Sequence, residues 1–106
     1  MFILMIGSTD SQATAETIVN LTSASLARGH RVTVFFNAES TRLLETKTGV
    51  EKLSGLISRG VRLLACRTSA QELGLTPRDI VKGAEMSSMG KLVDLVEASD
   101  RTLFLG

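Results

Sequence analysis

The sequence predicts an α/β fold in which helices cover both faces of a five-stranded parallel sheet. Three observations lead to this fold class. Short apolar runs alternate with longer amphipathic stretches along the chain, and the first run, residues 2–6, is apolar at every position. A strand without polar alternation is typical of a parallel sheet, because both of its faces are covered. The third observation is length: 106 residues fit one domain, which we expect to span residues 1–106.

The amino-terminal half supplies the first two strands, at residues 2–6 and 32–36. Between them, residues 11–28 carry apolar side chains at helical spacing, so we expect a helix that stops before Gly29. Two shorter helices are expected at residues 39–45 and 51–58, with a polar turn at residues 46–49. The residues expected to face inward from the long helix are Ala15, Ile18, Val19, Thr22 and Leu26.

The carboxyl-terminal half supplies three more strands, at residues 61–65, 80–81 and 101–105, of which the second has the weakest pattern. A short helix at residues 67–73 ends at Gly74. Ser87 or Ser88 can cap a last helix that runs to about residue 97. Its residues expected to face inward are Met89, Leu92, Val93 and Val96. The alternation implies right-handed crossovers and a flavodoxin-like three-layer sandwich.

Composition narrows the function classes. The net charge is +1, there is no basic run, and Trp and Tyr are absent, so we expect no direct nucleic-acid partner. The apolar run at the start stops at Gly7, too short for a signal peptide or a membrane span, so no membrane partner is expected. A single cysteine cannot form an internal disulfide, which favours a reducing, cytoplasmic location.

Open parallel sheets bind ligands beyond the carboxyl ends of their strands, where the strand order reverses. Residues 7–10, 37–40, 66–68 and 84–88 are expected at that edge. His30, the only histidine, is expected at the opposite edge. The candidate binding residues at the carboxyl edge are Gly7, Ser8, Thr9, Asn37, Arg67, Thr68, Met86, Ser87 and Ser88.

Cys66 directly follows a predicted strand and directly precedes a predicted helix. A thiol at the start of a helix faces unpaired backbone N–H groups, which favours the nucleophilic thiolate. The alternative is a buried cysteine that packs as a small hydrophobic residue. Other chemistries of this fold lack their residues: Glu72 stands where a phosphatase loop needs arginine, flavin-stacking rings are missing, and zinc has too few ligands. We therefore expect no metal and no cofactor, and either thiol chemistry or none.

The residues around Cys66 resemble those of a known family. The predicted strand at residues 61–65 ends in Cys66, and Arg67-Thr68-Ser69-Ala70-Gln71-Glu72-Leu73-Gly74-Leu75 follows. A strand, a cysteine and a short helix that closes in Gly-Leu are similar to the DsrE/DsrF/TusD-like sulfur-relay family. Residues 34–37, 83–89 and 99–104 support the resemblance, which covers nearly the whole chain.

The resemblance implies that Cys66 accepts sulfane sulfur as a persulfide and passes it to a partner, with the N–H groups that follow it as donors. It implies sulfur donor and acceptor proteins and a homo-oligomer, a trimer or a hexamer. Some family members lack the cysteine and serve as structural subunits. Two alternatives therefore stay open: an assembly subunit with a structural Cys66, and a subunit that binds small phosphate-bearing ligands at residues 7–10 and 86–88.

Overall fold

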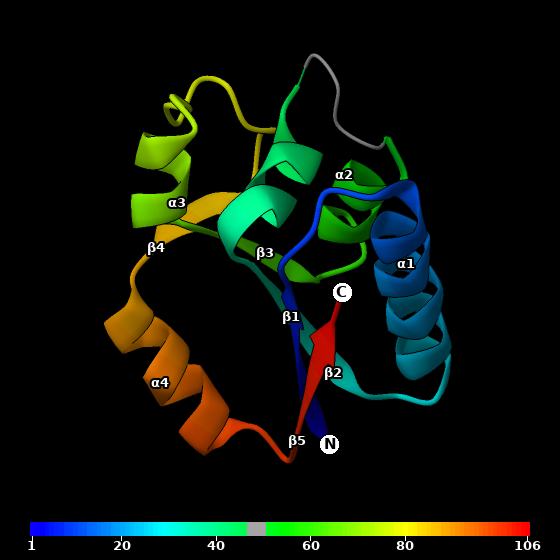
Figure 1. Cartoon of the computed structure of the whole chain (residues 1–106). Helices are drawn as coiled ribbons and strands as arrows, with labels where there is room; N and C mark the ends of the chain where they lie inside the picture. Colours follow the sequence, from blue (N-terminus) through cyan, green and yellow to red (C-terminus); the bar gives the residue numbers. More distant parts are fainter. Residues whose placement is uncertain (47–50) are drawn as a thin grey trace.

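A five-stranded sheet in the order β4-β3-β2-β1-β5 forms the centre of the computed structural model, which describes residues 1–46 and 51–106 (Figure 1). All four strand pairings are parallel. The fold class expected from the sequence, a five-stranded parallel sheet between helices, is confirmed. The strands are β1 (Phe2–Gly7), β2 (Arg31–Phe36), β3 (Arg62–Cys66), β4 (Glu85–Ser87) and β5 (Arg101–Leu105).

The helices begin where hydroxyl side chains can cap them. Ser11 Oγ accepts a hydrogen bond from the Thr14 amide at the start of the longest helix, and Ser88 Oγ accepts one from the Lys91 amide at the start of the last. The expected turn at residues 46–49 lies, apart from Thr46, outside the described residues. The helices are α1 (Gln12–Ala27), the 3₁₀ helix η1 (Ala38–Leu44), α2 (Glu51–Ile57), α3 (Arg67–Glu72) and α4 (Met89–Ala98).

The two faces of the sheet have separate cores. Ile3 and Met5 of β1 pack in a cluster with side chains of α1, η1 and α2. Phe2, Leu4 and Ile6, which alternate with them, face the other way and pack with Leu95 of α4. Figure 1 shows α1 and α2 on one side of the sheet and α4 on the other. The unbroken apolar run of β1 is thus explained, because every residue in it contacts a core.

The chain changes direction across the sheet after β4. From β1 to β4 the chain moves one strand at a time in one direction. The segment that leads into β4 stays on the α1 and α2 side, because Ile80, Val81 and Ala84 pack against that core. The next helix, α4, returns across the opposite face to place β5 beside β1. The topological switch point therefore lies between β1 and β5, and the ends of β3 and β4 lie at the same carboxyl edge of the sheet but away from that point.

The fourth strand is not where the sequence pattern indicated. Ile80 forms only an isolated antiparallel bridge with Glu45, and the strand itself is Glu85–Ser87. Residues 80–81 are apolar because they fill the α1-side core next to η1, not because they join the sheet. At the sheet edge, a three-residue strand with a charged first residue leaves no apolar run for a sequence pattern to detect.

Helix α4 also differs from the expectation. Leu92 and Leu95 pack toward the sheet, whereas Met89, Val93 and Val96 remain 47%, 55% and 42% exposed. Helix α1 follows its pattern: its buried residues include Ala15, Ile18 and Thr22, and the other two expected residues are partly buried against the same core. No helix among the described residues combines the length and apolarity needed to cross a membrane.

Candidate functional site

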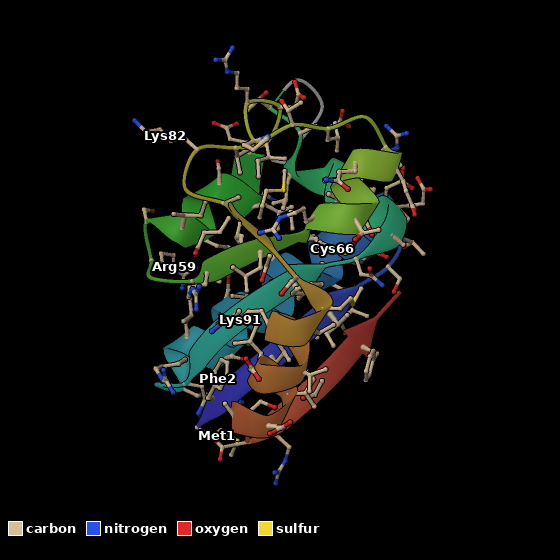
Figure 2. The ribbon with its side chains drawn as sticks, turned by 90° about the vertical axis from the view of Figure 1, so that its left-hand side faces the viewer. Met1, Phe2, Arg59, Cys66, Lys82 and Lys91 are labelled. Atoms are coloured by element: carbon tan, nitrogen blue, oxygen red, sulfur yellow. The ribbon has the colours of Figure 1, made fainter. Side chains whose placement is uncertain are left out.

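Cys66 is the last residue of β3 and the N-cap of α3, so it lies at the carboxyl edge of the sheet (Figure 2). Its side chain joins the apolar cluster on the α4 face, together with Leu64 and Phe35, and the residue is only 1% exposed. It makes no capping hydrogen bond to α3. The chain thus places its only thiol at the expected edge, but with the side chain in the core and without the expected bond to the N–H groups of the following helix.

Ser87 lies next to Cys66 across the sheet. The two residues are register partners in the parallel β3–β4 pairing, so both side chains point to the same face. Ser87 is 7% exposed. A hydroxyl and a thiol therefore lie side by side at the carboxyl edge of the sheet. The sequence indicated residues 86–88 as a loop and could not reveal this pairing, because it depends on the position of β4.

A hollow of about 410 Å³ is lined by the chain neighbours of this pair, Arg67 and Met86, and not by Cys66 or Ser87 themselves. Its walls are largely apolar, and its only charged residue is Arg67, which directly follows Cys66. The volume falls within the range of small-molecule sites. Arg67 and Met86, both expected at the binding edge, thus line one cavity. The lining residues are Arg67, Ala70, Gln71, Leu75, Pro77 and Met86.

A hydrogen-bonded tie holds α3 against the segment after β2. Ser69 Oγ accepts a hydrogen bond from the Ala38 amide (2.9 Å) and donates one to Asn37 Oδ1 (3.2 Å). Ala38 has a φ of 50°, a left-handed conformation that is uncommon for alanine. Asn37 is therefore near the cysteine, as expected. Ser69 is a residue that sequence reasoning missed, because nothing in its spacing distinguishes it from a solvent-facing helical serine.

The remaining candidates lie apart from Cys66, at the end of β1 or at helix starts. The Ser8 and Thr9 amides both donate to the carbonyl oxygen of Gly106, at 3.1 and 2.7 Å, so these amides already have a partner. Gly7 ends β1 and abuts Ser40. Thr68 is exposed in the first turn of α3, and Ser88 is used as the cap of α4. The structure thus divides the expected site into two groups.

A charged pair lies at the starts of β3 and β4, away from the carboxyl edge. Arg62 donates to both carboxylate oxygens of Glu85 at 3.1 Å. These hydrogen bonds lower the pKa of Glu85 and raise the pKa of Arg62 from their ordinary values. Lys91 of α4 adds to the lowering of the Glu85 pKa by its positive charge. His30 precedes β2 at the opposite edge, beside Arg59.

Comparison with known proteins agrees with this fold. The DsrE/DsrF-like family model matches residues 1–105. The chain is 27% identical over 100 residues to the uncharacterized protein MK0008 of Methanopyrus kandleri, covering 88% of this chain and 83% of that protein. The structure of MTH1491, a protein of unknown function from Methanobacterium thermoautotrophicum, superposes with a TM-score of 0.84 at 18% identity, covering 94% of this chain and 96% of that one.

The crystal structure of the E. coli protein ychN gives the same TM-score, 0.84, at 11% identity, with 98% of this chain and 97% of that chain covered. At these identities the structural matches establish the fold alone. The family match spans nearly the whole chain, and it confirms the resemblance that the sequence around Cys66 suggested. This chain is a member of the DsrE/DsrF-like family.

Proposed function

We propose that this protein is a sulfur-relay protein that carries sulfane sulfur as a persulfide on Cys66. The observation that carries the proposal is the place of the only thiol: Cys66 ends β3 at the carboxyl edge of a family member's sheet, the edge at which folds of this type bind their ligands. Ser87 and the hollow beside α3 supply a neighbouring hydroxyl and space for a donor. The cysteine is free, which suits a reducing cytoplasm.

The proposed chemistry is thiol–persulfide exchange. The Cys66 thiolate attacks the outer sulfur of a donor persulfide, R–S–SH. A new S–S bond forms on Cys66 while the donor's S–S bond breaks, and the electron pair leaves on the donor thiolate. The proton released by Cys66 neutralises that thiolate, so no oxidant or reductant is consumed. An acceptor thiolate repeats the exchange and takes the sulfur from Cys66, so donor and acceptor proteins are the proposed partners.

The burial of Cys66 sets a condition on this function. A thiol that is 1% exposed cannot meet another protein's persulfide unless the structure opens locally. The six-residue helix α3 and the three-residue edge strand β4 are the short elements around it. We infer that opening of α3 from the hollow exposes the sulfur during transfer. Closure would then shield the persulfide from solvent and from adventitious reductants.

The same burial favours a second candidate function. Cys66 packs in an apolar cluster with Leu64 and Phe35, as a structural cysteine does. In that case the chain is an assembly or ligand-binding subunit of the same fold, without sulfur transfer. The hollow at Arg67 is a better place for a small ligand than the loop at residues 7–10, because the Ser8 and Thr9 amides are already bonded.

Intact-mass spectrometry distinguishes the two candidates. The native protein is incubated briefly with inorganic polysulfide, alongside the Cys66→Ser variant and wild type unfolded in urea. The relay proposal predicts that native wild type gains the mass of one sulfur atom, that reductant removes it, and that Cys66→Ser gains nothing. After removal of the polysulfide, the loaded protein should convert added cyanide to thiocyanate. If only the unfolded wild type is modified, Cys66 is structural and the second candidate holds.

A further inference from the structure

A cavity at the amino-terminal edge of the sheet gathers positively charged side chains. It measures about 280 Å³, and its lining includes the first residue of each of three neighbouring strands, Phe2, Arg31 and Arg62. This edge is opposite the one that carries the thiol, and Figure 2 shows Phe2 and Arg59 away from Cys66. We call it the amino-edge cavity. Its basic lining residues are His30, Arg31, Arg59 and Arg62, and none of the described residues that line it is acidic.

Arg31 contributes a guanidinium group that is held in place but not neutralised. Its Cζ lies 5.0 Å from the centre of the Phe2 ring, and the two residues are register partners in β2 and β1. Stacking on an aromatic ring holds a guanidinium group by its face and leaves its N–H edge free to donate to oxygen atoms. No carboxylate among the described residues forms an ion pair with Arg31. Its positive charge is therefore available to a ligand.

Arg59 and His30 add further donors to the cavity. Ser23 Oγ accepts a hydrogen bond from Arg59 Nη1 at 3.1 Å, which positions this guanidinium group without neutralising it. Within the described part of the chain, Arg59 also has no ion pair with a carboxylate. His30 Nδ1 accepts a hydrogen bond from the Met1 nitrogen at 3.0 Å, so the ring hydrogen is on Nε2 and can be donated to an oxygen atom.

Arg62 differs from the other two arginines, because its charge is compensated. It donates hydrogen bonds to both carboxylate oxygens of Glu85. The amino-edge cavity therefore has two uncompensated positive charges, one on Arg31 and one on Arg59. Two like charges that line one small cavity repel each other, and a bound anion would relieve that repulsion.

Helix dipoles explain only part of this arrangement. A cation near the C-terminus of a helix is favourable without any ligand, because the last carbonyl groups carry partial negative charge. This effect accounts for Arg28, the C-cap of α1, and for Arg59, two residues beyond the end of α2. It does not account for Arg31, which begins a strand and lies over an aromatic ring. The convergence of Arg31 and Arg59 on one cavity is therefore the observation that points to a ligand.

The edge of the sheet that usually binds phosphate is already occupied at the switch point. In α/β sheets, phosphate is commonly bound by the amides at a helix N-terminus, at the carboxyl edge. Here the Ser8 and Thr9 amides, in the loop before α1, both donate to the carbonyl oxygen of Gly106. Guanidinium groups bind phosphate oxygens with side-chain donors instead. A phosphate site built on arginine side chains can therefore lie at the amino-terminal edge.

We propose that the amino-edge cavity binds the phosphate group of a small phosphomonoester. Such a group carries a charge of about −1.5 to −2 at neutral pH and three acceptor oxygens, which match the two uncompensated arginines and the Nε2 donor of His30. The cavity is just below the roughly 300–1,000 Å³ of small-molecule sites, so the organic part of the ligand is short. Leu26 and Val32, which also line the cavity, form an apolar wall for that part. The site does not involve Cys66 and is independent of the proposed sulfur relay.

Isothermal titration calorimetry of the intact protein tests the proposal, at about 0.15 M ionic strength to screen distant charges. The probes are glycerol 3-phosphate, inorganic phosphate and glycerol. We expect saturable binding of glycerol 3-phosphate, weaker binding of inorganic phosphate and no binding of glycerol. Arg31→Gln and Arg59→Gln should each raise the dissociation constant roughly 10-fold or more, because each removes hydrogen bonds to a charged group.

Two control variants separate this site from other effects. Arg28→Gln removes the same charge from an exposed residue of the same edge that does not line the cavity, so it should bind like wild type. Cys66→Ser should also bind like wild type, because the proposed sulfur site is at the other edge. Circular dichroism of each variant should show the wild-type fold. If Arg28→Gln weakens binding as much as the two cavity variants do, the cavity is not the site and the proposal is wrong.

Amide chemical shifts in nuclear magnetic resonance spectra locate the site without any substitution. Glycerol 3-phosphate should shift the amides of residues 30–33 and 59–62 and leave those of residues 66–72 unchanged. The proposal is overturned if no saturable binding occurs, if inorganic phosphate binds as tightly as the phosphomonoester, or if other amides shift instead. Wild-type affinity in both cavity variants would also overturn it. Tighter binding of a short single-stranded RNA at the same amides would replace it with a nucleic-acid site.

Discussion

At the scale of single residues, the reactivity of Cys66 depends on groups that hold its cover in place. The thiol is buried, the opening proposed for sulfur transfer moves α3, and α3 is tied to the segment after β2 through Ser69. This tie includes the only left-handed non-glycine residue among those described, Ala38. Strain in the backbone and a buried hydroxyl thus occur together beside the thiol, as is common at functional sites.

Loss of the Ser69 hydroxyl should make Cys66 more reactive. Ser69→Ala leaves the Ala38 amide without its partner, which costs about 1–2 kcal/mol of stability. If this loss of stability makes it easier for α3 to detach, alkylation of Cys66 in the folded protein should accelerate roughly 5–30-fold. The rate of iodoacetamide labelling, followed by mass spectrometry, measures this. Ser25→Ala, which removes a hydroxyl bond on the surface of α1, is the control and should leave the rate unchanged. A destabilised Ser69→Ala protein with an unchanged rate would contradict an opening at α3.

Replacement of Ala38 by glycine should stabilise the protein. Glycine adopts a φ of 50° without the steric cost that alanine has there, and the bond from its amide to Ser69 is retained. We expect a gain of about 0.5–1 kcal/mol in the free energy of unfolding by urea titration. The same substitution at Ala13, exposed in α1, should have the opposite sign and cost about 1 kcal/mol. If the glycine substitution lowers the free energy of unfolding at both positions, Ala38 is not strained.

At the scale of helices and strands, the sequence pattern predicted an element correctly where its apolar side chains pack against a single core. The strand at residues 101–105, the long helix and the Ser88 cap follow from local pattern alone. Sequence patterns failed at β4, because its pairing depends on Arg62 and Cys66 of a distant strand. They also failed on α4, because residues with the same apolar character face two different surroundings. The carboxyl-edge location of Cys66 was predictable, but its burial and the Ser69 tie were not.

The Arg62–Glu85 pair should anchor β4 in a pH-dependent manner. Both side chains are about half exposed, so solvent screens their attraction. A double-mutant cycle with Arg62→Met and Glu85→Gln should therefore give a coupling free energy of only about 0.2–1 kcal/mol at neutral pH. The pKa of Glu85 is lowered, so this contribution is complete above the ordinary glutamate pKa and is lost as pH falls through the lowered folded value. The coupling from urea titrations at pH 7 and at acid pH measures this. A coupling that grows on acidification would contradict the assignment.

At the scale of the whole molecule, the proposed sulfur site and the most exposed apolar side chain lie on different parts of the sheet. Cys66 ends β3, and the strands β2 and β1 separate it from β5, which carries Phe104 at 76% exposure. A contact between copies of this chain that uses Phe104 would therefore leave α3 within reach of donor and acceptor proteins.

Thermal stability should depend on protein concentration if the chain forms the homo-oligomer that the family resemblance implies. Only folded chains can associate in this way, so association stabilises the native state by mass action. For a chain of this size, each tenfold rise in concentration above the dissociation constant should raise the Tm by roughly 3–5 °C. Differential scanning calorimetry over a hundredfold concentration range measures the shift. The Phe104→Lys variant should show a smaller shift, and Leu21→Lys should follow wild type. If wild type and Phe104→Lys have the same concentration dependence, Phe104 lies outside the contact between copies. If neither has any, the folded chain does not gain stability from a second copy.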